Sequence, residues 1–458
     1  MSTPRPSPTA PPTSTERAPE ALIESIDHEG VGVSHVDGKV TFLEGGVTGE
    51  RVLFARKRSR GHFDMGVVTH VLRESSQRAV PKCRWYGTCG GCAMQHVDAA
   101  AQVAAKQRVL EDNLQRLGKV KPGMVLPAIL GPTWRYRNRA RLSVHYVAKK
   151  GGVLVGFHEK KSSFVADILS CEILPRHVAD LIPPLREMFT AMTIRDRLPQ
   201  IEVAVGESVT AFVLRHLVPI PDEDAARLRA FADAHGIQWW LQSKGPDTAV
   251  PFHPLEAPAI DYNLPEFGVT LGFRPTEFTQ VNAGVNRVLV KRAVDMLDPR
   301  PGERVGDLFC GLGNFSLPLA TRGAHVIGME GSPGLVQRAT DNAAANGLSD
   351  RARFIAYDLY TDAPGALAKL GPVDKLLIDP PRDGAMEICK ALPEAGGPSR
   401  IVYVSCSPST LARDAGLLVH TQGYTLEAAG VVNMFPHTGH VESIALFTRQ
   451  GAEARRTQ

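Results

Sequence analysis

The residues with the clearest chemical potential lie in the last third of the chain, beside apolar runs. Asp379 opens the segment Asp-Pro-Pro-Arg directly after one such run, and Cys406 follows the next run. Glu442 precedes the final run. Prolines restrict the backbone next to Asp379, and a cysteine just past a strand, where a helix could begin, is expected to have a lowered thiol pKa. The pattern predicts a carboxylate and a reactive thiol at one edge of a sheet; a plain strand-to-loop turn and a buried structural cysteine are the alternatives.

A glycine turn lies upstream of these residues. Gly311 and Gly313 stand between an apolar run at 304–308 and an apolar helix expected at 316–320. Glycines of this kind let the backbone approach a ligand closely, and Glu330, at the end of the next run, could accept hydrogen bonds from ribose hydroxyls. The third glycine of the dinucleotide fingerprint is missing. An adenosine ligand without a pyrophosphate, such as S-adenosylmethionine, therefore fits better, and a tight turn without a ligand is the alternative.

A thiol, a carboxylate base and a methyl donor together match one type of reaction. C5 of uracil is a weak nucleophile, and thiolate addition at C6 produces an enolate that activates it. After C5 has taken the methyl group, a base removes the C5 proton and the thiol is eliminated. Cys406 could supply the thiolate that adds to C6, and Glu442 could be the base that removes the C5 proton. Cys310 and Cys389 are interpreted as structural.

Three of the seven cysteines, Cys83, Cys89 and Cys92, form a C-x5-C-x2-C cluster. The N-terminus, residues 1–15, is rich in Ser, Thr and Pro and lacks the apolar core of a signal peptide, which indicates a cytosolic protein. In a reducing compartment, clustered cysteines indicate metal binding or catalysis rather than disulfides. The spacing differs from the C-x3-C-x2-C of radical enzymes, and thiolates suit either zinc or an iron–sulfur cluster.

The net charge of +4 conceals a strong asymmetry. Residues 51–172 carry 22 Lys and Arg against 8 Asp and Glu, a net charge of +14, while the rest carries 30 against 40, a net charge of −10. A basic region next to an acidic remainder is typical of a polyanion-binding module joined to another domain.

Two basic segments stand out in that region. Residues 56–62 are expected to form a basic loop between two strands, with a solvated hairpin tip as the alternative. On a strand predicted over 134–144, four arginines at alternate positions would share one face: Arg135, Arg137, Arg139 and Arg141. Either carboxylates of the protein or external phosphates must neutralise them, and the local shortage of acidic residues favours phosphates for some.

The wider pattern indicates how these groups are positioned. A length of 458 residues suggests about three domains. Short apolar runs separated by glycines between residues 21 and 72 predict a small β-barrel of the oligonucleotide-binding kind. A helix is expected at 98–117 with Asp98 as its N-cap, and from Gly268 alternating strands and helices predict a parallel sheet. No apolar run is long enough to span a membrane.

With these motifs together, the chain resembles the bacterial RNA (uracil-5)-methyltransferases, and among them those that act on 23S ribosomal RNA, over roughly residues 24–447. The resemblance implies an α/β fold: a Rossmann-like class I methyltransferase domain, an N-terminal OB-like β-barrel of the TRAM type and a small α+β central domain. The implied division is a disordered tail at 1–16, an RNA-binding barrel at 17–75, a cluster-bearing central domain at 76–267, a methyltransferase domain at 268–449 and a tail at 450–458. The helix at 98–117 could pack on the methyltransferase domain.

The resemblance also implies roles for particular residues. Cys406 corresponds to the nucleophile and Glu442 to the general base. Phe278 would either stack on an RNA base or belong to the core, while His437 and His440 are interpreted as structural. The positions that match S-adenosylmethionine-binding residues are Gln280, Phe309, Asn314, Glu330, Asp358 and Asp379. The four thiolates that would hold a 4Fe-4S cluster are those of Cys83, Cys89, Cys92 and Cys171.

The function implied is methylation of C5 of a specific uridine in 23S ribosomal RNA. The enzyme is expected to be cytoplasmic and monomeric, without a membrane association or an obligate protein partner. The same chemistry on another ribosomal site or on transfer RNA is the nearest alternative, although the transfer RNA enzymes of the family generally lack the barrel and the cysteine cluster. A non-catalytic iron–sulfur RNA-binding protein is a further alternative, but it would not need Cys406, Glu442 and the glycine turn together.

Overall fold

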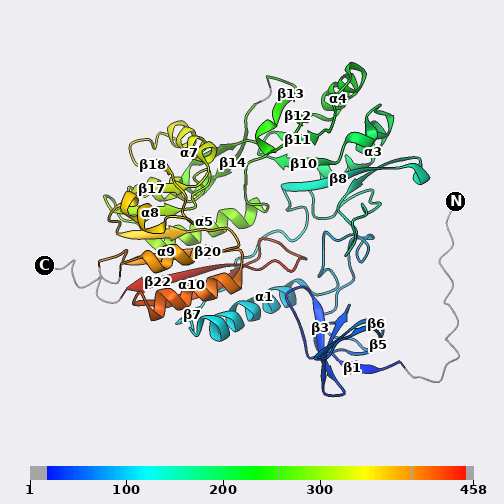
Figure 1. The fold of residues 1–458 in the computed structure, drawn as a ribbon, viewed down its shortest axis with the longest axis horizontal. Coiled ribbons are helices and arrows are strands. Elements are labelled where there is room, and N and C mark those ends of the chain that lie inside the picture. The colour runs from blue at the N-terminus through cyan, green and yellow to red at the C-terminus, as the bar shows by residue number, and fades with distance from the viewer. Residues whose placement is uncertain (1–17, 257, 394–395, 450–458) are drawn as a thin grey trace. The chain divides into compact units, whose positions relative to one another are not determined.

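The computed structural model describes residues 18–256, 258–393 and 396–449 (Figure 1). The chain divides into two compact units, with the boundary between Arg78 and Ala79. The tails expected at 1–16 and 450–458 lie outside the described residues. In the described part of the chain, no helix is both long enough and apolar enough to cross a membrane.

The N-terminal unit contains one curled sheet. Its strands are β1 (Glu20–Leu22), β2 (Ser25–Ile26), β3 (Val31–Val36), β4 (Lys39–Glu44), β5 (Arg51–Ser59) and β6 (Phe63–Arg73), in the order β1-β5-β6-β4-β3-β2. Along β3, β4 and the first halves of β5 and β6, buried side chains alternate with more exposed ones, as a sheet with one covered face requires. Ile23, Leu43 and Phe54 are fully buried at the centre of its small core.

The basic segment at 56–62 is not the loop that the sequence predicted. β5 continues through Ser59 and pairs with β6, so only Arg60 to His62 form the turn. Arg56 forms ion pairs with Asp37 at 3.1 Å and with Asp64 at 3.5 Å. Asp37, in the turn between β3 and β4, and Asp64, on β6, therefore neutralise part of a segment that looked uniformly basic in the sequence.

A mixed sheet of six strands follows in the second unit. Its strands are β8 (Arg139–Val147), β9 (Gly152–Gly156), β10 (Gln200–Val205), β11 (Thr210–Arg215), β12 (Gln238–Gln242) and β13 (Val250–His253), accompanied by the helices α2 (Arg176–Ala179), α3 (Ile182–Ala191) and α4 (Asp222–His235). The strand order is β13-β12-β11-β10-β8-β9, and Trp239 is fully buried against Phe189 and Phe212. β10 and β11 are buried on both faces, as strands in the middle of a sheet covered on both sides are.

The row of arginines is also arranged differently from the prediction. β8 begins only at Arg139, and Arg135 has a left-handed backbone with φ of 57°. Arg135 donates to the carbonyl oxygen of Cys171 and to Glu172, while Arg139 and Arg141 pair with Glu202. Carboxylates distant in sequence therefore neutralise three of the four arginines, so phosphates are not needed for them.

Arg137 differs from the other three arginines. Its Nε donates to the carbonyl oxygen of Arg139, and its guanidinium lies 5.9 Å from the ring centroids of both Phe157 and Phe435. No ion pair joins Arg137 to a carboxylate in the described part of the chain. Within the described residues, Arg137 is therefore the one of the four arginines that remains available to bind an external anion.

The C-terminal sheet is the parallel sheet that the sequence predicted. Its strands are β7 (Met124–Val125), β16 (Arg304–Leu308), β17 (His325–Glu330), β18 (Ala352–Ala356), β19 (Lys375–Ile378), β20 (Arg400–Ser405), β21 (Tyr424–Val432) and β22 (Glu442–Arg449). The order is β18-β17-β16-β19-β20-β22-β21-β7. β16 to β20 pair in parallel, and β22 is antiparallel to both of its neighbours. Next to the sheet, β14 (Ile260–Leu264) and β15 (Val269–Phe273) form a hairpin.

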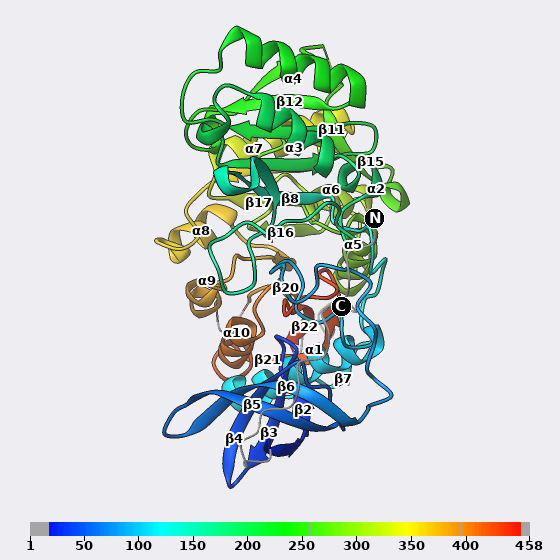
Figure 2. The same cartoon turned by 90° about the vertical axis from the view of Figure 1, so that its right-hand side faces the viewer.

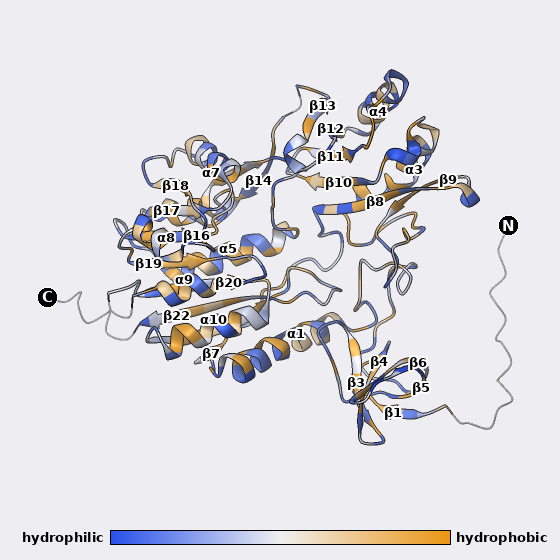
Figure 3. Cartoon of the chain, in the orientation of Figure 1, coloured by the Kyte–Doolittle hydropathy of each residue, from blue (hydrophilic) through white to orange (hydrophobic). Residues whose placement is uncertain are grey.

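Helices cover both faces of this sheet. They are α5 (Ala283–Leu297), α6 (Ser316–Thr321), α7 (Pro333–Ala345), α8 (Ala363–Leu370), α9 (Met386–Ala391) and α10 (Pro408–His420). Figure 2 shows α8, α9 and α10 on one side of the sheet and α5 on the other. Val402 and Val404 join the core of one face, whereas Ile401 and Tyr403 join that of the other, because successive side chains of a strand point in opposite directions. α10 combines hydrophobic and hydrophilic residues, as a helix with one buried face does (Figure 3).

The helix predicted at 98–117 is present as α1 (Ala99–Asn113), extended by a π-helical turn at Leu114–Gly118. The Asp98 side chain caps it by accepting a hydrogen bond from the amide of Ala100. α1 packs against α10 and β21, and a Cβ at Gly118 would collide with the carbonyl oxygen of Ala412. The segment from α1 to β7, residues 99–125, therefore packs into the core of the C-terminal sheet.

Candidate active site

A cavity of about 530 Å³ opens where the parallel strands end. The carboxyl ends of such strands meet at one edge of the sheet, where ligands of open α/β sheets bind. The residues that the sequence singled out for donor binding and catalysis all line this cavity: Gln280, Phe309, Asn314, Glu330, Asp358, Asp379, Cys406 and Glu442.

The glycine turn after β16 adopts the conformation that its glycines allow. Gly311 and Gly313 have φ of 55° and 98°, and Phe309 has φ of 62°. A positive φ is strained for a bulky residue and is concentrated at functional sites. The Glu330 carboxylate accepts hydrogen bonds from the amides of Gly311, at 3.2 Å, and Ser332, at 3.0 Å. The backbone thus orients the carboxylate that the sequence assigned to ribose hydroxyls.

Asn314 is held by two residues that the sequence analysis missed. Its side-chain oxygen accepts from the Tyr262 hydroxyl at 2.8 Å and from the Asn286 amide at 3.0 Å. The Asn314 amide donates back to Asn286 at 3.1 Å, and Tyr262 lines the cavity as well. Tyr262 comes from β14 and Asn286 from α5. The sequence carries no signal for this contact beyond the helical spacing that places Asn286 one turn after the N-cap Asn282.

The two aspartates of the cavity have opposite environments. Burial raises the pKa of Asp379 to about 7. The amides of Tyr360 and Thr361 donate to Asp358 and hold the pKa of its carboxyl below the usual value. Asp358 is therefore ionised at neutral pH, whereas Asp379 changes protonation state close to it.

The Cys406 thiol does not have the lowered pKa that its position predicted. Burial and the nearby carboxyls of Glu442 and Asp379 raise its pKa to about 11, although Arg382 acts in the opposite direction. α10 begins only at Pro408, so the helix end lies beyond the thiol. Burial and the neighbouring acids therefore raise the pKa of the Cys406 thiol more than the N-terminus of α10 could lower it.

Glu442 is a buried acid at the first position of β22. Burial, followed by the charge of Asp379, raises its pKa to about 8, while Arg382 and Lys106 favour its ionised form. His440 Nε2 lies 3.9 Å from the Glu442 carboxylate. A carboxyl with this pKa can both hold and release a proton near neutral pH, as a general base must.

The structure places Phe278, whose role was left open, and His437 and His440, which were interpreted as structural. Phe278 is 66% exposed at the cavity, so the alternative of a core aromatic is wrong. His437 lies away from the cavity lining and stacks on Trp134 with ring centroids 3.9 Å apart. His440 lines the cavity beside Arg382, and burial lowers its pKa to about 4. His440 therefore presents a neutral imidazole to the site.

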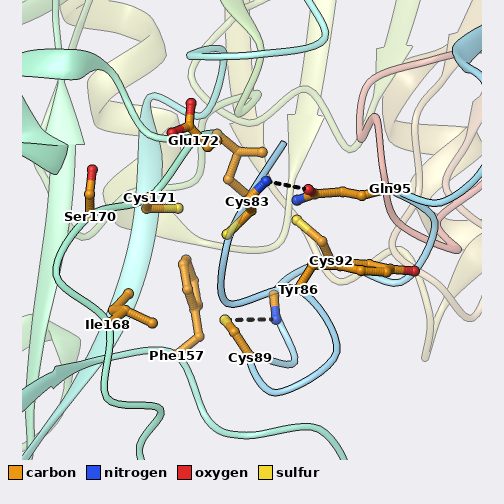
Figure 4. Close-up of a pocket in the computed structure, with 12 residues that line it drawn as sticks. Cys83, Tyr86, Cys89, Cys92, Gln95, Phe157, Ile168, Ser170, Cys171 and Glu172 are labelled. Atoms are coloured by element: carbon orange, nitrogen blue, oxygen red, sulfur yellow. Dashed lines mark hydrogen bonds between the residues drawn. The ribbon is translucent and has the colours of Figure 1, made fainter. Parts of the chain in front are cut away.

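The four cysteines grouped by the resemblance line one pocket, with Phe157 and Ile168 as apolar neighbours. In Figure 4 the sulfur atoms of Cys83, Cys89, Cys92 and Cys171 face a common space. Burial raises the pKa of each thiol, that of Cys92 to about 12 and that of Cys171 to about 11. Neighbouring thiols add to the effect for Cys89, Cys92 and Cys171, and the charge of Glu172 adds to it for Cys83. Within the described ranges, no three His, Cys, Asp or Glu side chains converge closely enough to hold a metal ion.

The other two cysteines are fully enclosed. Cys310 is 4% exposed and Cys389 is not exposed, and burial raises the pKa of both thiols well above the usual value. Cys310 nevertheless contributes to the cavity lining through its place in the glycine turn. Neither thiol has the environment of a nucleophile.

Comparisons with known proteins agree with this geometry. The family model described as tRNA (Uracil-5-)-methyltransferase matches residues 99–450. A protein of Thiobacillus denitrificans named 23S rRNA (uracil(1939)-C(5))-methyltransferase RlmD is 61% identical over 431 residues, which cover 94% of this chain and 100% of the relative. The protein of the same name from Azoarcus sp. is 56% identical with the same coverage.

A solved structure shares the fold. The Pyrococcus abyssi tRNA (uracil-54, C5)-methyltransferase, crystallised with S-adenosyl-L-homocysteine, superimposes with a TM-score of 0.70 and covers 94% of this chain and all of its own, at 22% identity. The full-length similarity to the curated relatives and the family match over most of the chain lead to one conclusion: the chain belongs to the RNA (uracil-5)-methyltransferase family.

Proposed function

We propose that this protein transfers a methyl group from S-adenosylmethionine to C5 of one uridine in 23S ribosomal RNA, yielding 5-methyluridine and S-adenosylhomocysteine. The observation that carries the proposal is that Cys406 and Glu442 line the same cavity as the residues predicted to bind the donor. The choice of substrate rests on the relatives, which are named for uracil 1939 of 23S rRNA. The proposed target is therefore the uridine that is equivalent to position 1939 of 23S rRNA.

In the proposed mechanism, Cys406 Sγ attacks C6 of the uracil as a thiolate, and the electron pair of the C5–C6 double bond moves toward O4. The donor supplies an electrophilic methyl group to the resulting enolate at C5. Glu442 then takes the C5 proton, the double bond re-forms, and the bond between Sγ and C6 breaks. Arg382 supports both residues, because its charge favours the thiolate and the carboxylate.

The donor would be held by residues with matching chemistry. The Glu330 carboxylate, oriented by two backbone amides, suits the ribose hydroxyls, and Asp358 suits the adenine end. Desolvation is the sole cause that raises the pKa of Asp379, and a positive charge beside it would favour its ionised form, so its carboxylate suits the positively charged part of the donor. Phe309, Asn314 and Gln280 would complete the donor site.

We assign the C-terminal domain, residues 268–449, to the Rossmann-like class I methyltransferases, because five parallel strands are followed by an antiparallel strand inserted between β20 and β21. We assign residues 17–75, the region of the N-terminal sheet, to the TRAM type of RNA-binding barrel and residues 76–267 to a central domain. Ribosomal RNA as the substrate implies a cytoplasmic enzyme, and we propose that it acts as a monomer.

We infer that Cys83, Cys89, Cys92 and Cys171 hold a 4Fe-4S cluster. The support for this inference is that the four thiols line one pocket. Four thiolates are a ligand set for either a zinc ion or a 4Fe-4S cluster, and the family resemblance favours the cluster. The methyl transfer includes no redox step, so the cluster would crosslink the segments that carry its ligands.

Metal analysis tests this inference. Protein purified without oxygen is expected to be brown and to contain about four iron atoms per chain. Cys89→Ser is expected to lose most of the iron, whereas Cys389→Ser, altered outside the pocket, is expected to keep it. Colourless protein with stoichiometric zinc would overturn the assignment.

The substrate is tested by mapping 5-methyluridine in ribosomal and transfer RNA from a strain that lacks the gene. Loss of the modification is expected at one site in 23S ribosomal RNA. Restoring the gene should return it, and restoring the Cys406→Ala variant should not. Loss in transfer RNA with intact 23S ribosomal RNA would redirect the proposal to a transfer RNA substrate.

A further inference from the structure

Lys106, on α1, is a fully buried lysine whose hydrogen-bond partners are all uncharged. Its Nζ donates to the side-chain oxygen of Asn433 at 3.0 Å and to the carbonyl oxygen of Phe435 at 2.8 Å. No ion pair links it to a carboxylate among the residues that the structure describes. Because burying a charge without a paired counter-charge is unfavourable, a purely packing role would be served better by an apolar side chain.

Gln102 lies one helical turn before Lys106 and binds the same segment. Its side-chain oxygen accepts from the amide of His437 at 2.9 Å, while its Nε2 donates to the carbonyl oxygens of Met94 and Val97. Residues four apart project from the same face of a helix. α1 therefore fixes the segment at two places, near residues 433–435 and at residue 437.

The segment held in this way forms part of the active-site wall. It connects β21 to β22, and Glu442 follows it directly. Phe435 and His440 from this segment line the cavity together with Glu442. Any shift of residues 433–441 would therefore move the carboxylate relative to Cys406.

Lys106 and Glu442 also interact through their charges. Burial lowers the pKa of Lys106 to about 8, and Glu442 acts against this effect. Lys106 in turn favours the ionised form of Glu442, together with Arg382. The titratable and charged groups around Glu442 are Asp379 and Arg382 after β19, Cys406 after β20, His440 before β22, and Lys106 on α1.

We propose that Lys106 is a positioning residue for Glu442: it fixes the segment at 433–441 and supplies a positive charge that favours the carboxylate needed to accept the C5 proton. This inference rests on the proposed function, because it requires Glu442 to act as the base. It assigns to α1, outside the catalytic sheet, a direct influence on the last step of the reaction.

The test measures how fast the covalent protein–RNA adduct forms and resolves in single-turnover experiments between pH 6 and 9. Lys106→Met removes the charge and retains an unbranched chain, and Lys106→Gln retains a hydrogen-bond donor without the charge. Both variants are expected to form the adduct within about twofold of the wild-type rate. Both variants should resolve the adduct about tenfold more slowly at pH 7. This is the effect of raising the pH midpoint of the resolution step by about one unit.

The direction of the pH effect distinguishes loss of the Lys106 charge from a structural defect in the variants. Losing the Lys106 charge disfavours the Glu442 carboxylate, so the resolution profile moves to higher pH. Above about pH 8 the wild-type lysine itself loses its proton, and the rates of variant and wild type should converge. A purely structural defect would slow resolution equally at every pH and leave the midpoint unchanged, which would overturn the inference.

Arg108→Met is the matched control, because its side chain is 64% exposed on the same helix. It is expected to leave the resolution profile unchanged. If Lys106→Met does not fold, Lys106→Gln becomes the decisive variant. If its adduct resolves with the same pH dependence as in the wild type, the proposed role of the Lys106 charge is wrong. Absence of any adduct with the wild-type enzyme would instead refute the proposed function, so the two failures are distinguishable.

Discussion

Cys406→Ala is expected to reduce methyl transfer by at least about a thousandfold while S-adenosylmethionine still binds. Alanine has no group that can add to C6, so C5 of the uracil is never activated. Cys406 follows β20, whereas the residues predicted to hold the donor belong to other segments of the cavity lining. Donor binding should therefore remain close to that of the wild type.

Two measurements on the same preparations check this result. Isothermal titration gives the donor affinity, and transfer of a labelled methyl group to a 23S ribosomal RNA fragment gives the activity. Cys389→Ala, a change at a buried position of α9, is the control and should keep its activity. Methylation by Cys406→Ala at the wild-type rate would show that the proposed mechanism is wrong.

Glu442→Gln is expected to trap the RNA on the enzyme as a covalent adduct that already carries the new methyl group. The amide is close in size to the carboxyl but cannot accept the C5 proton, so elimination of the thiol slows by about a hundredfold or more. In the wild type the pKa of Glu442 is raised to about 8. The basic form therefore increases from pH 6 to pH 8, and resolution should accelerate over that range, whereas the variant should show no such acceleration.

Denaturing electrophoresis detects the adduct, and mass spectrometry establishes whether it contains the methyl group. Glu427→Gln, a change of an exposed carboxyl on β21, should give no adduct and normal turnover. If no adduct of Glu442→Gln survives denaturation, Glu442 is not the base, and another acid of the cavity must remove the proton.

Much of the candidate site could be predicted from the sequence, because its residues lie at element ends that local patterns reveal. The runs before Cys310, Asp379 and Cys406 were each identified, and β16, β19 and β20 are present there. Parallel strands bring their carboxyl ends to one edge. Residues more than 90 positions apart in the chain, such as Phe309 and Cys406, could therefore be assigned to one place without a structure.

The electrostatics of the site could not be predicted in the same way. The thiol of Cys406 was expected to be more acidic than usual, but burial and two neighbouring carboxyls make it less acidic. External phosphates were favoured over carboxylates of the protein for at least some of the four arginines, but Glu172 and Glu202 neutralise Arg135, Arg139 and Arg141. A pKa depends on burial and on charges brought close by folding, and neither can be read from neighbours in the sequence.

The sequence by itself determined which residues could do chemistry: a thiol, three acids, a glycine turn and a cluster of three cysteines, to which only the family resemblance added Cys171. Side-chain type and the apolar pattern around it are local properties, so these features needed no tertiary contacts. Only the tertiary structure decided how they are held and charged. Lys106 contacts Asn433 across 327 positions of the chain, and Gln102 contacts His437 across 335. Contacts at such separations arise from packing between elements, which is why the support of the general base became visible only in the folded protein.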